Sequence, residues 1–216
     1  MKSTIILVRH GKSEGNVKSA DDVSFPEKAN HKFSLTEKGK RQVVVAGKYI
    51  KENFPYPDTF FCSTFWRTRE SLFHMFPEAT PNRDSRLNEL WRGIWHTMSK
   101  ERILALYPEE PAIREREGEY HYRPPGGQNG PDVELGIYSF LRDLRNLNKN
   151  RTKGGTVLVS AHGNWMLLFE RVVLNKLPQD FEYRYKNDRY QNGALAVYEM
   201  DGSGNIRLIA EIVPPK

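Results

Sequence analysis

Ser3-Thr4-Ile5-Ile6-Leu7-Val8 runs directly into Arg9-His10-Gly11, and this stretch decides the fold. Its apolar, β-branched residues predict a short buried strand that delivers the following residues to the carboxyl edge of a sheet. The same pattern returns far along the chain, where residues 156–160 precede Ala161-His162-Gly163. Because the carboxyl ends of parallel strands meet at one edge of a sheet, the two imidazoles are expected to converge on one crevice.

The segments around these two strands alternate in type. Helical periodicity predicts helices over 36–53, 66–76, 99–107, 131–148 and 165–174, with Thr36 as the N-cap of the first. Short β-rich runs predict a strand over 59–62 and a terminal hairpin that pairs 194–199 with 206–213. This alternation predicts an α/β fold, a three-layer α/β/α sandwich with a mostly parallel central sheet.

Length and composition indicate an ordinary globular protein. With 216 residues, of which 38% are hydrophobic and 28% charged, the chain is expected to form one domain over 1–216. The segment 88–130 is richer in Trp, Tyr, Pro and charge, and we interpret it as an insertion within that domain. A single cysteine, Cys62, and the lack of a long apolar run favour a cytoplasmic protein with no membrane partner.

The formal net charge of +6 suits a polyanionic partner, but Lys and Arg are interleaved with Asp and Glu along the chain. A solvated surface of mixed charge explains this distribution, and local focusing of positive charge around an anionic substrate is the alternative. Nucleic-acid binding is not expected, because the basic residues are not interleaved with aromatic residues and form no known module.

The residues around the two histidines suit a phosphate group. Arg9 adds a planar cation that binds two phosphate oxygens at once. Gly11 and Gly163 are expected to let the backbone approach a ligand, and a helix N-terminus beyond each strand is expected to offer it free N–H groups. Ser-His-Asp hydrolysis lacks a nucleophile elbow here, and metal-assisted hydrolysis lacks a compact cluster of His and carboxylate residues.

The run from Arg9 to Asn16, Arg-His-Gly-Lys-Ser-Glu-Gly-Asn, resembles the signature of the histidine phosphatase superfamily, which includes phosphoglycerate mutases and fructose-2,6-bisphosphatases. Further landmarks follow in the family's order, and the resemblance spans nearly the whole chain. They are Leu35-Thr36 with Gly39 and Gln42, Ser63 with Arg67, Leu87-Asn88-Glu89, and His162-Gly163. The resemblance implies a phosphoglycerate mutase-like fold and phosphoryl transfer that needs no metal or cofactor.

The resemblance also implies a role for each matching residue. His10 attacks phosphorus, Arg9, Arg67 and His162 hold the three non-bridging oxygens, and Glu89 protonates the leaving oxygen. Glu119 and Glu134 are the alternative acids, and Arg69 is the alternative to Arg67. The implied substrate-binding residues are Ser13, Asn16, Gly163 and Asn164, together with Arg114, which either binds a second anionic group or is a solvated arginine at a helix end.

The segment from Leu87 to Gln128 is similar to the fructose-2,6-bisphosphatase and broad-specificity phosphatase branches, which favours a phosphomonoester phosphatase acting on a small phosphorylated substrate. A mutase dependent on 2,3-bisphosphoglycerate is the second hypothesis, and a catalytically silent phosphate-binding protein is the third. The chain departs from its relatives at Gln128-Asn129, where they often have Glu-Ser, and at Gly136, where they carry an arginine. These departures leave the natural substrate open, and the sequence leaves the oligomeric state open as well.

Overall fold

The computed structural model describes residues 2–17 and 29–215, and it has the predicted α/β architecture. Strands β1 (Ser3–Arg9), β2 (Thr59–Cys62), β3 (Asn82–Arg83), β4 (Thr156–Ala161), β5 (Leu195–Met200) and β6 (Ile206–Ile212) form one sheet within these ranges. The helices are α1 (Glu37–Asn53), α2 (Trp66–Met75), α3 (Lys100–Leu106), α4 (Glu110–His121), α5 (Gly130–Lys149), α6 (Gly163–Val173) and α7 (Pro178–Asn187). Short 3-10 turns, η1 (Glu14–Asn16), η2 (Asn30–Lys32), η3 (Ser85–Leu87) and η4 (Gly93–Thr97), occupy parts of the connections.

The sheet has the strand order β3-β2-β4-β1-β5-β6. Strands β3, β2, β4 and β1 pair in parallel, whereas β5 is antiparallel to β1 and to β6, as the predicted terminal hairpin requires. Arg9 at the end of β1 is the partner of Ala161 at the end of β4. This alignment places His10 and His162, each one residue further along, side by side at the carboxyl edge.

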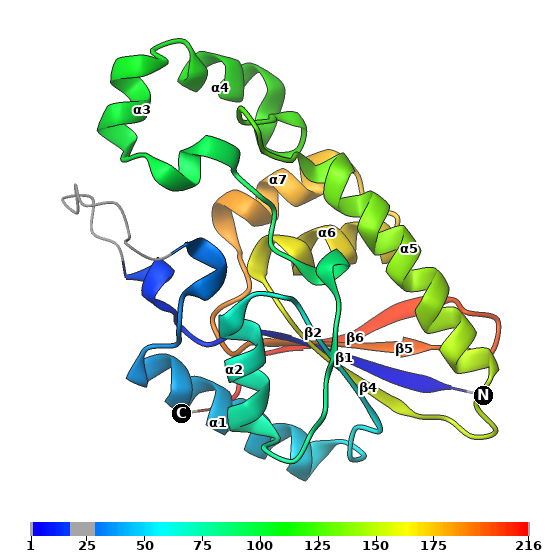
Figure 1. Cartoon of the computed structure of the whole chain (residues 1–216). Helices are drawn as coiled ribbons and strands as arrows, with labels where there is room; N and C mark the ends of the chain where they lie inside the picture. Colours follow the sequence, from blue (N-terminus) through cyan, green and yellow to red (C-terminus); the bar gives the residue numbers. More distant parts are fainter. Residues whose placement is uncertain (1, 18–28, 216) are drawn as a thin grey trace.

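The alternation of side chains along β1 builds both outer layers. Ile5 and Leu7 face a buried cluster that includes residues of α5 and α6, whereas Ile6 and Val8 face a second cluster with residues of α1 and α2. All four side chains are at most 1% exposed. Figure 1 shows the resulting three layers, with α1 and α2 on one side of the sheet and α5 and α6 on the other.

The segment interpreted as an insertion holds η4, α3 and α4, which lie beyond the sheet in Figure 1. Here the prediction missed α4, which has weak helical periodicity and contains Gly118 at a φ of +73°. The prediction also missed α7, although Pro178 stands in its first turn, as is common in helices. Residue Asn129 caps α5, so this helix begins before the predicted start at Pro131. Among the described residues, no helix combines the length and the apolar character that crossing a membrane requires.

Candidate active site

His10 lies immediately after β1 and is 3% exposed. Its Nδ1 is 2.7 Å from the carbonyl oxygen of Gly11, and only a protonated Nδ1 makes this contact favourable. A neutral His10 therefore carries its lone pair on Nε2. That atom accepts a hydrogen bond of 3.2 Å from Arg67 Nε, so the lone pair of His10 is directed at a cation. This nitrogen is the one suited to attack an electrophile.

Arg67 and Arg9 approach the histidine from different elements. Arg67 lies in the first turn of α2, where its guanidinium stacks on Phe65 at 4.7 Å and donates to the Asn30 carbonyl at 3.0 Å. Arg9 ends β1, and its Nη1 donates to the carbonyl oxygen of Tyr190. The alternative, Arg69, is exposed and stacks on Trp66, so α2 presents Arg67 to His10 and directs Arg69 away from it.

His162 is fully buried beside His10, with the two ring centroids 5.2 Å apart in an edge-to-face arrangement. Its Nε2 is 2.7 Å from the hydroxyl of Ser63, a buried residue at the end of β2. Its Nδ1 is buried and has no hydrogen-bond partner among the described residues, and the same holds for Nε of Arg9. Among the described residues, these two buried nitrogens thus have no hydrogen-bond acceptor at this edge of the sheet.

The Glu89 carboxylate lies at the N-terminus of α6. Its Oε1 accepts from the Trp165 amide at 3.3 Å and its Oε2 from the Asn164 amide at 3.4 Å, where the helix dipole favours a negative group. The N–H groups that we expected to bind a ligand anion are thus taken by this carboxylate. Beyond β1 the same expectation is wrong, because η1 is only three residues long and α1 begins much later.

The other two candidate acids are engaged elsewhere. Glu134 is buried in α5, where it pairs with Arg171 at 2.5 Å and accepts from the Tyr120 hydroxyl at 2.9 Å. Glu119 pairs with Arg114 at 2.6 Å. Glu89 is the candidate acid that accepts from the amides of Asn164 and Trp165, close behind His162 in the chain. Burial lowers the pKa values of Arg9 and Arg67, and the negative charge of Glu89 offsets part of this effect.

The two glycines serve packing as well as turning. A Cβ on Gly11 would collide with the backbone of Gly39, so Gly11 is needed for close contact between the end of β1 and the start of α1. A Cβ on Gly163 would lie 3.2 Å from Arg9 Nε, which places Gly163 directly against the guanidinium.

Burial sets the protonation of the two histidines. Desolvation lowers the pKa of His10 well below its ordinary value, and the positive charges of Arg67 and Arg9 lower it further. Desolvation lowers the pKa of His162 in the same way, again assisted by Arg67. Burial also lowers the pKa of Arg67 to about 10, at which the guanidinium remains charged near neutral pH. The site thus holds neutral imidazoles beside the cationic Arg9 and Arg67.

These pKa shifts predict how stability depends on pH. As the pH falls below about 6.5, the unfolded chain protonates His10 and His162 while the folded chain does not, so the free energy of unfolding should decrease. Each imidazole contributes up to about 1.4 kcal/mol per pH unit. Urea unfolding between pH 8 and pH 5 measures this slope, and the double variant His10→Gln, His162→Gln should have a shallower one. Equal slopes would contradict the prediction.

A cleft of about 1060 Å³ lies beside these groups, lined by Arg9 but not by His10, Arg67 or His162. Its floor includes Arg9, Glu89, Gly163 and Asn164, and its walls come from η4, α3, α4 and α7. Asn16 also lines it, while Ser13 is buried and holds Asn16 through hydrogen bonds from its backbone N–H and its hydroxyl to Asn16 Oδ1 at 3.0 and 3.1 Å. Arg114 lines the cleft too, with its guanidinium on Glu119.

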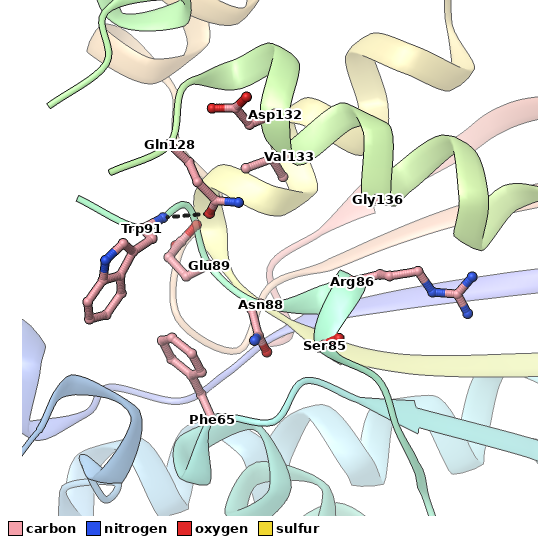
Figure 2. A pocket seen from close by; sticks show the side chains of 10 residues that line it. All are labelled: Phe65, Ser85, Arg86, Asn88, Glu89, Trp91, Gln128, Asp132, Val133 and Gly136. Carbon is pink, nitrogen blue, oxygen red and sulfur yellow. Dashed lines mark hydrogen bonds between the residues drawn. The ribbon is translucent and has the colours of Figure 1, made fainter. Parts of the chain in front are cut away.

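Glu89 also lines a smaller pocket of about 350 Å³, shown in Figure 2. The pocket lies between Phe65, Trp91 and the start of α5, and the Trp91 amide donates to Gln128 Oε1 at 3.2 Å across it. Gly136, which has no side chain to fill the pocket, also lines it. Glu89 therefore borders two cavities.

Some contacts that build the site carry no signal in the sequence pattern. The Asn192 side-chain amide donates to the His10 carbonyl at 3.0 Å, and the Gly193 amide donates to the Arg9 carbonyl at 3.0 Å. The loop between α7 and β5 thus holds the end of β1 in place. Ser63 belonged to a family landmark, but its contact with His162 depends on the pairing of β2 with β4, which a local pattern does not reveal.

The sequence model of the histidine phosphatase superfamily (branch 1) matches residues 5–210. The chain belongs to this superfamily. Within it, a 2,3-bisphosphoglycerate-dependent phosphoglycerate mutase from Mesorhizobium japonicum is 30% identical over 169 residues, covering 76% of this chain and 78% of that protein. A phosphoglycerate mutase-like protein from Arabidopsis thaliana is 34% identical over 161 residues, covering 68% of this chain and 48% of that protein.

Solved structures share the superfamily fold over almost the whole chain. A mycobacterial glucosyl-3-phosphoglycerate phosphatase matches with a TM-score of 0.76 at 19% identity, covering 96% of this chain and 97% of that one. A putative alpha-ribazole-5'-P phosphatase from Escherichia coli matches with a TM-score of 0.75 at 15% identity, covering 96% and 95%. At these identities the comparison establishes the fold, and the mostly parallel sheet flanked by helices agrees with the prediction.

Proposed function

We propose that the protein is a metal-independent phosphomonoester phosphatase that forms a phosphohistidine on His10. The observation that carries this proposal is the gathering of two histidines and two arginines, His10, His162, Arg9 and Arg67, at one edge of the sheet. The Nε2 lone pair of His10 accepts a hydrogen bond from Arg67 Nε, a donor that a phosphoryl oxygen would take over. A phosphoryl transition state spreads negative charge over its equatorial oxygens, and positioned cations lower its energy. Arg9 and Arg67 would supply two such cations, and Nδ1 of His162, which has no partner among the described residues, would supply a neutral hydrogen-bond donor.

In the first step, His10 Nε2 bonds to phosphorus while the bond from phosphorus to the leaving oxygen breaks. The carboxylic acid form of Glu89 gives its proton to that oxygen, and the alcohol departs. The Gly11 carbonyl accepts the Nδ1–H hydrogen bond throughout and stabilises the positive charge that develops on the ring. In the second step, a water molecule gives a proton to the Glu89 carboxylate and bonds to phosphorus. The N–P bond then breaks and returns the electron pair to Nε2.

Both His162 and Ser63 fit this sequence of steps. If the Ser63 hydroxyl donates to Nε2 of the neutral imidazole, the ring proton is placed on Nδ1, the nitrogen without a partner among the described residues. His162 then donates to a phosphoryl oxygen without carrying a charge of its own.

Phosphatase activity is tested with p-nitrophenyl phosphate in the presence of EDTA, in which we expect turnover with release of inorganic phosphate. A screen over sugar phosphates, phosphoglycerates, nucleotides and phosphopeptides then ranks natural substrates. The mutase relatives make interconversion of 2- and 3-phosphoglycerate the second candidate reaction. Interconversion stimulated by 2,3-bisphosphoglycerate with little phosphate release would replace the first proposal with the second.

A further inference from the structure

Among the described residues, one acceptor holds the guanidinium of Arg9. Its Nη1 donates to the carbonyl oxygen of Tyr190, whereas its buried Nε has no partner there and lies beside Gly163. The main chain of Arg9 is fixed separately, because its N–H donates to the Ala194 carbonyl and its carbonyl accepts from the Gly193 amide, each at 3.0 Å. The Tyr190 carbonyl therefore sets the direction in which the guanidinium points.

Tyr190 is itself held at two points. Its side chain is 3% exposed, and its hydroxyl donates to Glu170 Oε2 at 2.7 Å. The Arg184 guanidinium covers the ring at 4.9 Å from the ring centroid. Because both the ring face and the hydroxyl are fixed, Tyr190 has little freedom to shift, and its carbonyl stays directed at Arg9.

Glu170 of α6 anchors Tyr190 from the interior of the protein. It is 1% exposed, and a carboxylate buried to this degree needs charged partners. It pairs with Arg184 of α7 at 2.9 Å and with Lys176, and Arg184 also pairs with Glu211 of β6 at 2.5 Å. Two cations thus balance two carboxylates, and this ion cluster ties Tyr190 to α6, α7 and β6.

We infer that Tyr190, held by Glu170, is a positioning residue that directs the Arg9 guanidinium at the phosphoryl group. This inference rests on the proposed function, in which Arg9 binds phosphoryl oxygens. Neither Tyr190 nor Glu170 lines the cleft, so neither is placed to contact a substrate there. An arginine side chain that is anchored before the ligand arrives loses less conformational freedom on binding, so the anion is bound more tightly.

Calorimetric titration with inorganic phosphate measures this effect without requiring turnover. Tyr190→Phe removes only the hydroxyl that donates to Glu170. We expect the Kd for phosphate to rise about 5-fold, less than the full contribution of a hydrogen bond to a charged group, because the loosened carbonyl still reaches Arg9. Glu170→Gln replaces the charged acceptor by a neutral amide of nearly the same shape and should raise Kd in the same direction. An unchanged Kd in either variant overturns the part of the inference that concerns that residue.

A double-mutant cycle separates positioning from a general structural role. Arg9→Ala should itself raise the Kd for phosphate by about 10-fold or more, because it removes a charge-assisted contact. When Tyr190→Phe is added to Arg9→Ala, Kd should not rise further, since the guanidinium that Tyr190 positions is gone. A rise by the same factor in both backgrounds would show that the hydroxyl acts independently of Arg9, and it would overturn the inference.

Tyr183→Phe is the matched control, because it removes an exposed tyrosine hydroxyl of α7 outside the cleft and should leave Kd unchanged. Partial unfolding of a variant would lower the number of sites per chain, but not the affinity of the sites that remain. If the unmodified protein binds phosphate but hydrolyses no phosphomonoester, the proposed function fails while the cycle still decides the inference. No phosphate binding by the unmodified protein refutes both.

Discussion

His10→Ala should lower kcat for p-nitrophenyl phosphate by at least about 10⁴-fold, the largest effect that we expect from any single substitution. Alanine removes the Nε2 lone pair that faces Arg67, and no second nucleophile replaces it, because Nε2 of His162 contacts Ser63. Steady-state kinetics measures the loss. Near-normal turnover in this variant would overturn the assignment of the nucleophile.

A trapping experiment shows whether the lost activity is that of a phosphoenzyme. Protein mixed with a radiolabelled phosphomonoester and quenched in alkali should retain label, whereas His10→Ala should retain none. His121→Ala is the matched control, since His121 is exposed at the end of α4 and should trap label like the unmodified protein. Binding of substrate by the unmodified protein without any trapped label would favour the silent phosphate-binding hypothesis.

The proximity of the two histidines was predictable, because the strand that precedes each of them has a clear local sequence pattern. Apolar β-branched runs before His10 and His162 predict buried strands, and parallel pairing of such strands aligns their ends. For the two histidines, local patterns and one rule of sheet topology were sufficient. Arg67 was identified only through the family resemblance, with Arg69 as the alternative.

Other parts of the site depend on contacts between distant segments. Glu89 follows η3 and carries no periodic signal, so only the family resemblance identified it; its place is set by amide groups of α6. The Arg92 guanidinium donates to the hydroxyl of Tyr185 in α7, a helix that was not predicted. The sequence near either residue does not encode such contacts across the fold, so this part of the cleft wall was the least predictable.

The insertion shows why substrate preference is hard to derive from motifs. The resemblance to relatives drew attention to Arg114, but its guanidinium is paired with Glu119 at 2.6 Å, while Arg92 lies 4.0 Å from the same carboxylate. The role of an arginine depends on which carboxylate lies within ion-pair distance of its guanidinium. This competition is decided by packing of α4 against α7.

Glu89→Gln should have a second large effect, and its size should depend on the leaving group. Glutamine is nearly the same shape and keeps an oxygen for the α6 amides, but it has no proton to give. For glycerol 3-phosphate, whose alkoxide is a poor leaving group, we expect kcat to fall by about 10² to 10⁴-fold. The phenolate of p-nitrophenyl phosphate departs without protonation. For this substrate the rate of the first step should therefore fall far less.

The dependence on the leaving group distinguishes Glu89 from the other candidate acids. Glu119→Gln should change both substrates by a similar small factor, because Glu119 pairs with Arg114 in the cleft wall. Single-turnover measurements separate the two halves of the reaction, since Glu89 also takes the proton from water when the phosphohistidine is hydrolysed. With p-nitrophenyl phosphate the variant should therefore form the phosphoenzyme and accumulate it. An equal loss of first-step rate for both substrates would show that Glu89 does not act as the proton donor.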